Sequence, residues 1–481
     1  MWLEIHHPEL REDSAATQAS FSVGFQVGDI ARKVYDPDAC GAMIDIEAEG
    51  FGAAFERSKA LMQTPQPVFE AGFSANGALA FADVMRPQEV NGRLMWHMVE
   101  VKSSTSVKNY HRDDVAVQSY VARSAGIALA SVALAHIDSS WTYPGDGDYR
   151  GLLKENDLTE EAFARADEVE SWIAKAAAIA EAESEPAVTT GDQCWSPFEC
   201  GFYGYCTRND NKPECPVNWL PRITSGKIKA LADQGIIDMR DVPDALLNER
   251  QARVKDYTLH GTVYFDRAAT AEALAAYPLP ACFLDFETIQ FAVPIWKGTR
   301  PYQQIPFQFS LHVLDESCEL HHTPFLDLSG NDPSEAFAQA LLAACDHHGP
   351  VFVYNAGFET ARIRELADRF PLLSGDLLAI NDRVVDLLPI AREHYYHPSQ
   401  EGSWSIKKVL PAVVPELRYD ALDGVQDGGM AMDAFLEGIH PGTSSVRKAE
   451  IERQLLAYCC LDTYAMVRLW QVFAGRNELR L

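Results

Sequence analysis

The chain has 481 residues, of which 41 are Lys or Arg and 69 are Asp or Glu, so its formal net charge is −28 at pH 7. Hydrophobic residues make up 47% and charged residues 23%, a composition that excludes a disordered or fibrous chain. The acidic balance argues against loose electrostatic binding to nucleic acid, which needs Lys and Arg. It does not argue against a nuclease that gathers carboxylates around metal ions.

No apolar run in the chain reaches the roughly 20 residues that a membrane-spanning helix needs. The longest candidate, residues 125–135, is alanine-rich and predicts a packed helix. The first residues, MWLEIHHPELRED, lack the basic start and apolar core of a secretory signal. We therefore expect a cytoplasmic protein with no membrane partner.

Apolar periodicity and breaker residues predict a mixed α/β protein in three parts. The predicted parts are residues 1–215, a short helical linker over 216–275, and residues 276–481. In the first part we expect helices over 24–34, 113–134 and 160–185 and strands over 78–85 and 94–102. In the linker we expect helices over 227–235 and 244–254. In the third part we expect strands over 281–286, 306–313 and 350–354 and helices over 334–346 and 358–369.

A β-hairpin is predicted around Asn91-Gly92, because this dipeptide suits a two-residue type I′ turn, in which both central residues have positive φ. Such a turn places Asp83 opposite Glu100 on the neighbouring strand. Directly opposed like charges are destabilising, so we expect a cation between them. Lys102 lies two residues beyond Glu100, on the same face of the strand.

These three residues suit a metal-assisted hydrolytic site. The carboxylates would hold a divalent cation that lowers the pKa of its water, and Lys102 would orient that water. From spacing alone, the alternative is an exposed hairpin in which Lys102 bridges two surface acids. Pro87 favours this alternative, since it can interrupt the first strand and shift the register.

The motifs around this hairpin resemble the PD-(D/E)xK nucleases of the RecB and CRISPR-adaptation type. The matching segments are Phe69-Glu70-Ala71, Ala82-Asp83-Val84, Val99-Glu100-Val101-Lys102-Ser103 and Gln118. The resemblance implies that Glu70, Asp83 and Glu100 bind metal. It also implies that Lys102 and Gln118 complete the catalytic site.

The ten cysteines are unevenly spread, and a group of four falls within 22 residues: Cys194, Cys200, Cys206 and Cys215. A local group of this kind in a chain without a secretory signal favours a metal or iron–sulfur site over disulfides. Zinc or a cubane cluster needs four ligands, so Cys215 is the candidate for the fourth, with Cys40 as an alternative. A chance grouping of free cysteines is the remaining interpretation.

The cysteine spacing resembles the RecB-like iron–sulfur nucleases, whose [4Fe–4S] cluster takes three cysteines after the nuclease core and one near the N-terminus. In that family the first cysteine stands a few residues before a Trp-containing helix, and here the sequence starts Met1-Trp2-Leu3-Glu4. The resemblance implies a [4Fe–4S] cluster whose fourth ligand is either Cys215 or a cysteine upstream of Met1. Such a cluster would staple the nuclease lobe rather than carry electrons.

A second group of acids lies in the third part of the chain. Asp285 and Glu287 follow an apolar strand start at alternate positions, so both project from one face. Glu359 opens a predicted helix, and Tyr458 and Asp462 lie four residues apart on one helix face. Four converging acids could hold two divalent ions for phosphodiester cleavage. Each piece alone is also typical of plain strands and helix surfaces.

In its order, this set resembles the DEDD exonuclease superfamily, in the version whose last motif carries Tyr. The resemblance implies an RNase H-like fold with 3′–5′ exonuclease chemistry. The implied metal ligands are Asp285, Glu287, Glu359 and Asp462. Tyr458 would position the attacking water, and Asn355 matches the Asn that opens the second motif. Glu359 stands where the superfamily usually has Asp, and its extra methylene moves the carboxylate by about an ångström.

The third part as a whole resembles an uncharacterised bacterial family in which this domain follows a RecB-like iron–sulfur nuclease. The motifs that carry this resemblance are LDFET, YNAGFE, DLL, SIKKVLP and YCCLD. Within them, Asp386 suits a structural role, and Lys407 and Lys408 suit either a phosphate backbone or a solvated helix start. Residues 226–244 faintly resemble helix-hairpin-helix DNA-binding modules, with a plain helical spacer as the alternative.

Together these motifs predict a metal-dependent DNA nuclease with two candidate active sites that use Mg²⁺ or Mn²⁺. The alternative is a non-catalytic nucleic-acid-binding or assembly protein in which one or both sites have decayed. A small-molecule redox protein is a third interpretation, but the chain lacks a flavin or nicotinamide motif such as G-x-G-x-x-G after a strand. Clustered carboxylates are costly without metal, which favours the nuclease.

Overall fold

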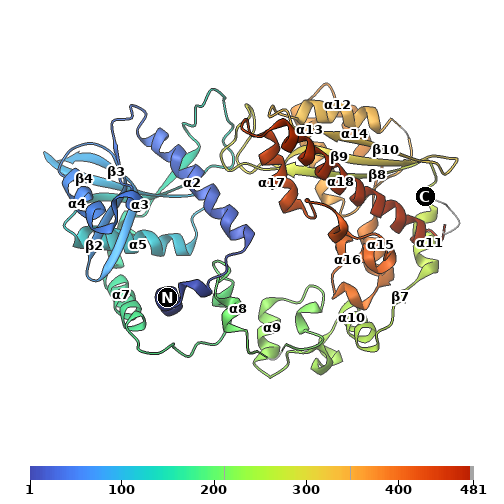
Figure 1. The fold of residues 1–481 in the computed structure, drawn as a ribbon, viewed down its shortest axis with the longest axis horizontal. Helices are drawn as coiled ribbons and strands as arrows, with labels where there is room; N and C mark the ends of the chain where they lie inside the picture. Colours follow the sequence, from blue (N-terminus) through green and yellow to red (C-terminus); the bar gives the residue numbers. More distant parts are fainter. Residues whose placement is uncertain (211, 347, 477–481) are drawn as a thin grey trace. The chain divides into compact units, whose positions relative to one another are not determined.

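The structure is a computed structural model that describes residues 1–210, 212–346 and 348–476. Its contacts divide the chain into two compact units (Figure 1). The first unit holds Met1–Asp210 and the segment Phe291–Gln303, and the second holds Asn211–Gln290 and Gln304–Leu481. Residues 216–275, expected as a linker, fall within the second unit. None of the described helices is both long and apolar enough to cross a membrane.

The first unit is built on a mixed sheet whose described strands follow the order β1-β2-β3-β4-β5-β6. Their bounds are β1 (Ala42–Met43), β2 (Val68–Ala75), β3 (Ala78–Val90), β4 (Arg93–Lys102), β5 (Leu129–Ile137) and β6 (Leu153–Asp157). The pairs β1–β2 and β4–β5 are parallel, and the other neighbouring pairs are antiparallel. The parallel strands β4 and β5 need a crossover, which α5 provides.

Helices cover both faces of this sheet. The described helices of the unit are α1 (Trp2–His6), α2 (Ala15–Tyr35), α3 (Ile46–Glu49), α4 (Phe51–Leu61), α5 (Asn109–Ser124), α6 (Thr159–Ala164), α7 (Ala166–Ala180) and α8 (Tyr203–Cys206). On one face α5 shares a hydrophobic core with Met98 and Leu134. On the other, Tyr35 of α2 packs with Val99 and Ala135, the next residue in each strand. The acidic helix expected over 160–185 is divided between α6 and α7.

The predicted hairpin is confirmed. Asn91 and Gly92 have φ values of 51° and 74°, as a type I′ turn requires. The pairs run in a single register from Val90↔Arg93 outward to Val84↔Val99. Pro87 lies inside β3 without shifting this register.

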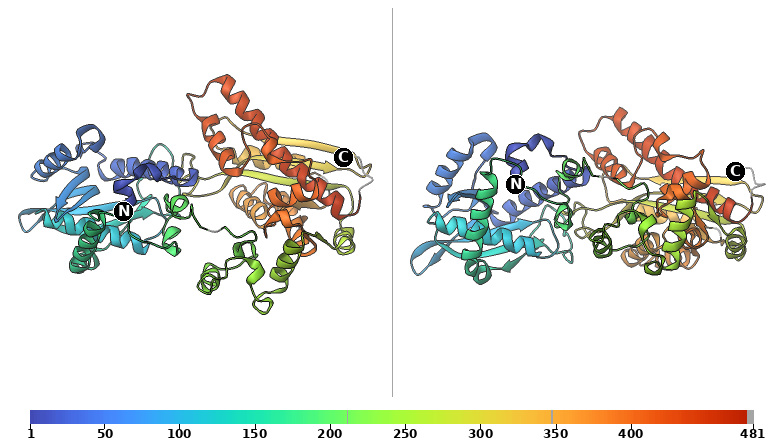
Figure 2. Two further views of the ribbon diagram at one scale, coloured as in Figure 1. Left: turned by 60° about the horizontal axis from the view of Figure 1, so that its bottom comes forward. Right: turned by 90° about the horizontal axis from the view of Figure 1, so that it is seen from below.

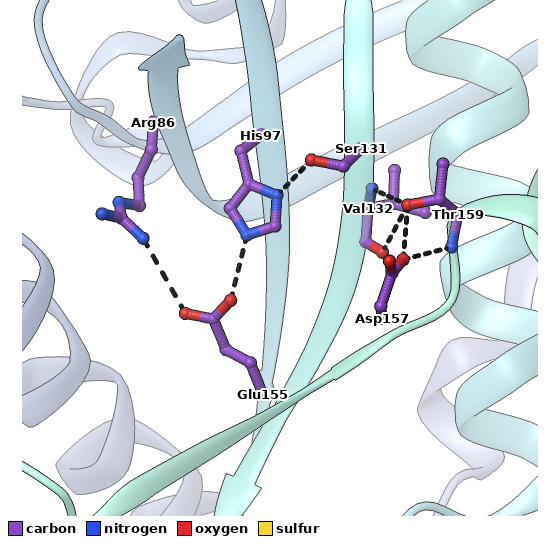
Figure 3. Close-up of polar contacts among 7 residues, drawn as sticks. All are labelled: Arg86, His97, Ser131, Val132, Glu155, Asp157 and Thr159. Atoms are coloured by element: carbon purple, nitrogen blue, oxygen red, sulfur yellow. Dashed lines mark hydrogen bonds and ion pairs between the residues drawn. The ribbon is translucent and has the colours of Figure 1, made fainter.

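A side-chain network ties β6 to the hairpin and to β5 (Figure 3). Glu155 of β6 lies 3.0 Å from His97 Nε2 and 3.8 Å from the Arg86 guanidinium. The other ring nitrogen of His97 lies 2.6 Å from Ser131 Oγ of β5. These contacts hold the middle of β4, the strand whose end carries the candidate acid and lysine.

The prediction of one helix over 113–134, including the packed alanine-rich stretch, is wrong beyond residue 124. Helix α5 ends at Ser124, Gly126 has a φ of 87°, and the chain enters strand β5 at Leu129. This strand pairs with β4 on one side and β6 on the other, and most of its residues are buried. A strand covered on both faces is apolar at successive positions, so it lacks the alternation by which exposed strands are recognised.

The second unit is built on a sheet whose described strands follow the order β10-β9-β8-β11-β12. Their bounds are β8 (Ala281–Ile289), β9 (Ile305–Leu314), β10 (Leu320–Leu326), β11 (Val351–Val353) and β12 (Val384–Asp386); β7 (Tyr264–Phe265) and β13 (Tyr395–Tyr396) form a separate antiparallel pair. Strand β9 pairs antiparallel with β10 on one side and with β8 on the other. Strand β11 is parallel to both β8 and β12.

Two layers of helices enclose this sheet. The described helices of the unit are α9 (Ser225–Ala232), α10 (Glu249–His260), α11 (Arg267–Ala275), α12 (Ser334–Ala344), α13 (Gly357–Arg369), α14 (Ser374–Asn381), α15 (Leu387–His394), α16 (Ile406–Val413), α17 (Gly428–Ile439) and α18 (Ser445–Phe473). Helix α18 lies across β8 and β9 on one face, where it contacts α17 near its start (Figures 1 and 2). Helices α12, α13 and α14 form the core of the other face.

The expected elements of the third part are confirmed as β8, β9, β11, α12 and α13, with ends within a few residues of the prediction. Helix α9 matches the stretch expected over 227–235, whereas α10 starts only at Glu249, later than the expected 244. Besides β5, the strands that the prediction missed are β1, β2, β6, β7, β10, β12 and β13. Strand β10 is a largely exposed edge strand and β12 is only three residues long, so neither carries a strong apolar pattern.

Candidate functional site

Four candidate residues of the first unit line one cavity. Glu70 on β2, Asp83 on β3, and Glu100 and Lys102 on β4 form part of its wall. The cavity has a volume of about 720 Å³, and α2 and the segment after β1 form much of the rest. Of the five residues predicted for this site, the structure brings four to the same cavity.

Lys102 places a positive charge in this group. Its Nζ lies 2.6 Å from Glu100 Oε1 and 2.7 Å from Asp114 Oδ2. Asp83 instead accepts a hydrogen bond from the Val101 N–H at 2.6 Å. The expected cation therefore lies beside Glu100, but its second partner is Asp114 of α5. Glu100 Oε2 is buried and has no hydrogen-bond partner among the described residues.

Burial and mutual repulsion disfavour negative charge on these acids. Burial, and after it the Glu70 carboxylate, raises the pKa of Asp83 to about 7. Burial and then Asp83 raise the pKa of Glu100 well above its ordinary value. Burial opposes the charge on Lys102, but Glu100 and Asp114 outweigh it and raise the lysine pKa. Negative charge that is buried and crowded in this way would be stabilised by a bound divalent cation.

Gln118 is not part of the cavity wall. From α5, its Nε2 lies 3.3 Å from Asp114 Oδ1, and its Oε1 is buried without a partner among the described residues. It therefore reaches Lys102 through Asp114, which the sequence analysis missed. The available signal was spacing, because Asp114 precedes Gln118 by four residues and shares its helix face. Tyr120, two residues after Gln118 on α5, is held away from the cavity by a hydrogen bond that its hydroxyl accepts from Asn76.

Three of the predicted cluster ligands lie near one another in the first unit. The Cys200 N–H donates to the Cys194 carbonyl at 2.8 Å. Burial, followed by the Cys200 and Cys194 thiols, raises the pKa of Cys206. The N-terminal segment contacts the same loop, since the Glu12 N–H donates to the Gly201 carbonyl at 2.9 Å.

The two other candidate cysteines have different surroundings. Cys215 belongs to the second unit, where its N–H donates to Asp238 Oδ2 at 3.2 Å. Burial, followed by Asp238, raises the pKa of its thiol. Cys40 follows α2, and its thiol donates to Asp36 Oδ1 at 3.3 Å. Within the described residues, the Cys40 thiol makes no hydrogen bond to the three cysteines of the loop.

In the second unit, Asp285, Glu287 and Asp462 converge. One carboxylate oxygen from each lies within 4.8 Å of the other two, a spacing that suits a shared metal ion. Asp285 and Glu287 come from β8, and Asp462 comes from α18. Two tyrosines hold Asp462: the Tyr419 hydroxyl donates to its Oδ1 at 2.6 Å, and the Tyr458 hydroxyl is a second hydrogen-bond partner.

Burial also raises the pKa values of this second group. Burial and then Asp462 raise the pKa of Asp285 well above its ordinary value. The same two causes raise the pKa of Glu287 to about 8. Burial raises the pKa of Asp462 to about 6, against the opposing hydrogen bond from Tyr419. As in the first unit, the carboxylates repel one another in a buried place.

Glu359 is not one of the converging carboxylates. It lies in the first turn of α13 and is 2% exposed, and its Oε2 has no partner among the described residues. Burial raises its pKa to about 8. Its charge nevertheless contributes to the raised pKa of Asp285, so it lies within electrostatic reach of the group. The structure therefore brings three of the four predicted acids within range of one ion.

The structural role predicted for Asp386 is confirmed by its hydrogen bonds. Its carboxylate accepts the N–H groups of Asn355 at 2.9 Å and Ala356 at 3.1 Å. It also caps α15 by accepting the Leu388 N–H at 2.9 Å. These bonds fix the turn after β11, in which Asn355 has a φ of 79°.

Sequence reasoning missed Tyr419 and left Lys407 undecided. Lys407 Nζ lies 5.0 Å from the centroid of the Tyr458 ring and 5.4 Å from that of Tyr419. Its charge lowers the pKa of both Glu287 and Asp462. Tyr419 belongs to none of the motifs and approaches Asp462 from 43 residues away in the chain. Only the tertiary fold could identify these two residues.

A buried hydrogen-bond network beside Asp462 fixes α18 on the sheet. The next residue, Thr463, has its Oγ1 2.6 Å from Ser310 Oγ and 2.8 Å from His312 Nδ1. Ser310 Oγ lies 2.9 Å from His322 Nε2. The position of the acid on α18 is therefore set by contacts with β9 and β10.

Comparison with known proteins finds a family model that is similar to part of the chain. Residues 282–405 match DUF2779, a domain of unknown function. Over 167 residues, 32% of this chain, the sequence is 26% identical to an uncharacterized protein of Ureaplasma parvum serovar 3. The chain spans 24% of that relative's length. No solved structure matches the chain. The DUF2779 match includes Asp285, Glu287 and Glu359 and ends before Tyr458 and Asp462.

The crowded acids predict a stability that depends on pH and metal. Each raised carboxyl pKa means that the folded state favours the protonated acid. The contribution of these acids to the free energy of unfolding is therefore complete below about pH 4 and is lost as pH rises towards 8. We expect the Tm of metal-free protein to fall by several degrees between pH 5 and pH 8, and Mn²⁺ to restore it at pH 8. Differential scanning fluorimetry measures both effects.

Comparing the Tm of wild type with that of Glu287→Gln isolates this group from other acids, and Asp376→Asn is the matched control. The Glu287→Gln variant should lose part of the pH dependence, whereas Asp376→Asn, at an exposed position of α14, should keep it. Identical pH profiles for wild type and Glu287→Gln would contradict the prediction.

Proposed function

We propose that the protein is a metal-dependent nuclease that hydrolyses phosphodiester bonds of DNA, with one candidate active site in each compact unit. The observation that carries the proposal is the convergence of Asp285, Glu287 and Asp462 within 4.8 Å, together with raised carboxyl pKa values. Structural acids are normally paired with cations or exposed. Buried acids that face one another favour a metal ion as the missing partner.

Strand topology supports the two fold assignments. In the second unit, three antiparallel strands are followed by two parallel ones in the order β10-β9-β8-β11-β12, which is the arrangement expected of an RNase H-like domain. In the first unit, a three-stranded meander, β2 to β4, is followed by α5 and the parallel strand β5. That arrangement is the one expected of a PD-(D/E)xK lobe. Asp285 and Glu287 lie on β8, Asp462 lies on α18, and the three acids of the first unit lie on β2, β3 and β4.

The residues present fit Mg²⁺ or Mn²⁺. In the second unit Asp285, Glu287 and Asp462 would hold the ion, with Glu359 adding negative charge within electrostatic reach of Asp285. When bound, such an ion activates a water molecule and neutralises charge on the phosphate. Burial, followed by Asp462, raises the pKa of Tyr458, so its hydroxyl keeps its proton and can orient the water.

In the first unit Glu70, Asp83 and Glu100 would hold the ion, and the unpartnered Glu100 Oε2 is the oxygen free to do so. Lys102 stays protonated, because Glu100 and Asp114 raise its pKa. Its ammonium group can steady negative charge that develops on the phosphate. Gln118 would position this lysine through Asp114.

Cys194, Cys200 and Cys206 would supply three ligands of a [4Fe–4S] cluster. The support is their proximity in one loop, which the N-terminal segment also contacts. Iron content of protein purified without oxygen tests the assignment. Cys200→Ser should lose iron and Cys318→Ser should retain it, and equal iron in both would contradict a cluster at this loop.

One observation favours a second candidate function, in which the protein binds nucleic acid or assembles a complex without cleaving. Glu359 does not converge with the other acids, and a DEDD site needs four. In this alternative the second unit is a binding platform, and any hydrolysis belongs to the first.

The experiment that tests the proposal uses full-length protein purified without oxygen and end-labelled single-stranded DNA. Mn²⁺ should give shortened products, EDTA should stop the reaction, and excess Mn²⁺ should restore it. If folded, metal-loaded protein leaves the DNA intact, the nuclease proposal fails for this substrate and the assembly alternative replaces it.

A further inference from the structure

A second cavity of the second unit is rich in arginine. Its volume is about 410 Å³. Arg222 reaches it from the turn before α9, Arg250 from α10 and Arg392 from α15. Two further parts of its wall are Tyr354 and Asn355, which follow β11, and Trp404, Ser405 and Ile406, which lead into α16. Three arginines from separate elements thus line one hollow of a protein whose net charge is −28.

Two of these three arginines are not neutralised by nearby acids. Within the described residues, neither Arg222 nor Arg392 forms an ion pair with a carboxylate. Arg250 lies 3.1 Å from Glu393 Oε2, and that exposed carboxylate is shared with Arg253. The Nε of Arg250 is buried and has no hydrogen-bond partner among the described residues. The cavity therefore holds an excess of positive charge, since no acid is among its lining residues.

The backbone adds further donors at the same place. Helix α16 begins at Ile406, and its N-cap residue, Ser405, makes no side-chain cap. The first-turn N–H groups of this helix are therefore not satisfied by a capping side chain, and the helix dipole favours an anion there. Planar guanidinium groups match the oxygen atoms of phosphate in a two-point geometry.

We propose that this arginine cavity binds a phosphate group of a nucleotide chain. A carboxylate ligand would satisfy fewer of the donors, since phosphate offers more acceptor oxygens to three guanidinium groups. The arginine cavity is distinct from the acid group, but successive residues at the start of α16 lie beside each of them. Ile406 lines the cavity, and Lys407, the next residue, lies over the Tyr458 ring beside Asp462.

A strand whose scissile phosphate lies at Asp285, Glu287 and Asp462 would place another of its phosphates in the arginine cavity. This placement on a substrate strand rests on the proposed function, whereas phosphate binding itself does not. The cavity would then hold the strand in register while the acids act, which is a common use of phosphate contacts.

The test measures binding in EDTA, so that no cleavage interferes. Full-length wild type, Arg392→Gln and Arg222→Gln are titrated against a fluorescent single-stranded oligonucleotide with and without a 5′-phosphate, and inorganic phosphate serves as competitor. Each substitution should weaken binding by roughly 10-fold and lower the salt dependence by about one phosphate contact. Arg364→Gln, at an exposed position of α13, is the matched control and should bind as wild type.

The two oligonucleotides identify the source of the phosphate. If the arginine variants lose affinity for both, the cavity holds a backbone phosphodiester; if they lose it only for the phosphorylated one, it holds a terminal phosphate. Because binding is measured without metal and without cleavage, its outcome does not depend on whether the protein is a nuclease, which separates this proposal from the proposed function. Unchanged affinity in folded Arg222→Gln and Arg392→Gln, or no displacement by phosphate, would overturn it.

Discussion

Replacing Asp285 by Asn is expected to lower Mn²⁺-dependent trimming of DNA ends by roughly 100-fold or more. Asp285 shares its site with Glu287 and Asp462, and loss of one charged ligand weakens the hold on the ion and its effect on water. A loss of about 3 kcal/mol of transition-state stabilisation corresponds to that factor. The rate of end-label release under single-turnover conditions measures the change.

The same substitution should make the metal-free protein more stable. Asp285 is a half-buried acid that repels Asp462 and Glu359, so removing its charge relieves that repulsion. A higher Tm with a lower activity is the signature of a functional acid rather than a structural one. Asp368→Asn, at an exposed position of α13, is the control and should change neither quantity. Normal end-trimming by folded Asp285→Asn would show that this group is not the trimming site.

Replacing Lys102 by Ala is expected to lower cleavage by the first unit by roughly 100-fold. Lys102 is the cation that lies between Glu100 and Asp114, at 2.6 and 2.7 Å. Loss of one such donor at a developing negative charge typically costs that much in rate. Cleavage of DNA without free ends isolates this activity from end-trimming, because the second unit is proposed to act on ends.

Stability needs its own control here, because Lys102→Ala leaves Glu100 buried without its partner. Asp83→Asn removes a proposed metal ligand while keeping the lysine pair, so it should lose activity with little loss of Tm. Lys175→Ala, at an exposed position of α7, should behave as wild type. Full internal cleavage by both Asp83→Asn and Lys102→Ala would exclude the first cavity as an active site.

Local chemistry explains which parts of the fold were predictable. The hairpin register follows from Asn91-Gly92 alone, because a two-residue turn fixes every pair on either side of it. That register predicted Asp83 opposite Glu100 before any tertiary information. The strands and helices of the third part were predictable because their apolar patterns are long and bounded by breaker residues.

Tertiary effects explain what was missed. Strand β5 has the composition of a helix, and only its position inside the sheet makes its alanines suitable for a strand. Tyr419 and Lys407 reach the acid group from separate segments, without a motif spacing that links them to Asp462. Asp114 takes the cation that the hairpin alone would share with Asp83. Each of these depends on packing between elements distant in sequence.

The most direct measurement compares wild type with the double variant Lys102→Ala and Asp285→Asn on end-labelled DNA in Mn²⁺. The account predicts cleavage by wild type, partial activity in at least one single variant, and none in the double variant, which should still bind DNA through its arginine cavity. Cleavage by the folded double variant at the wild-type rate would contradict the assignment of hydrolysis to these two groups of acids.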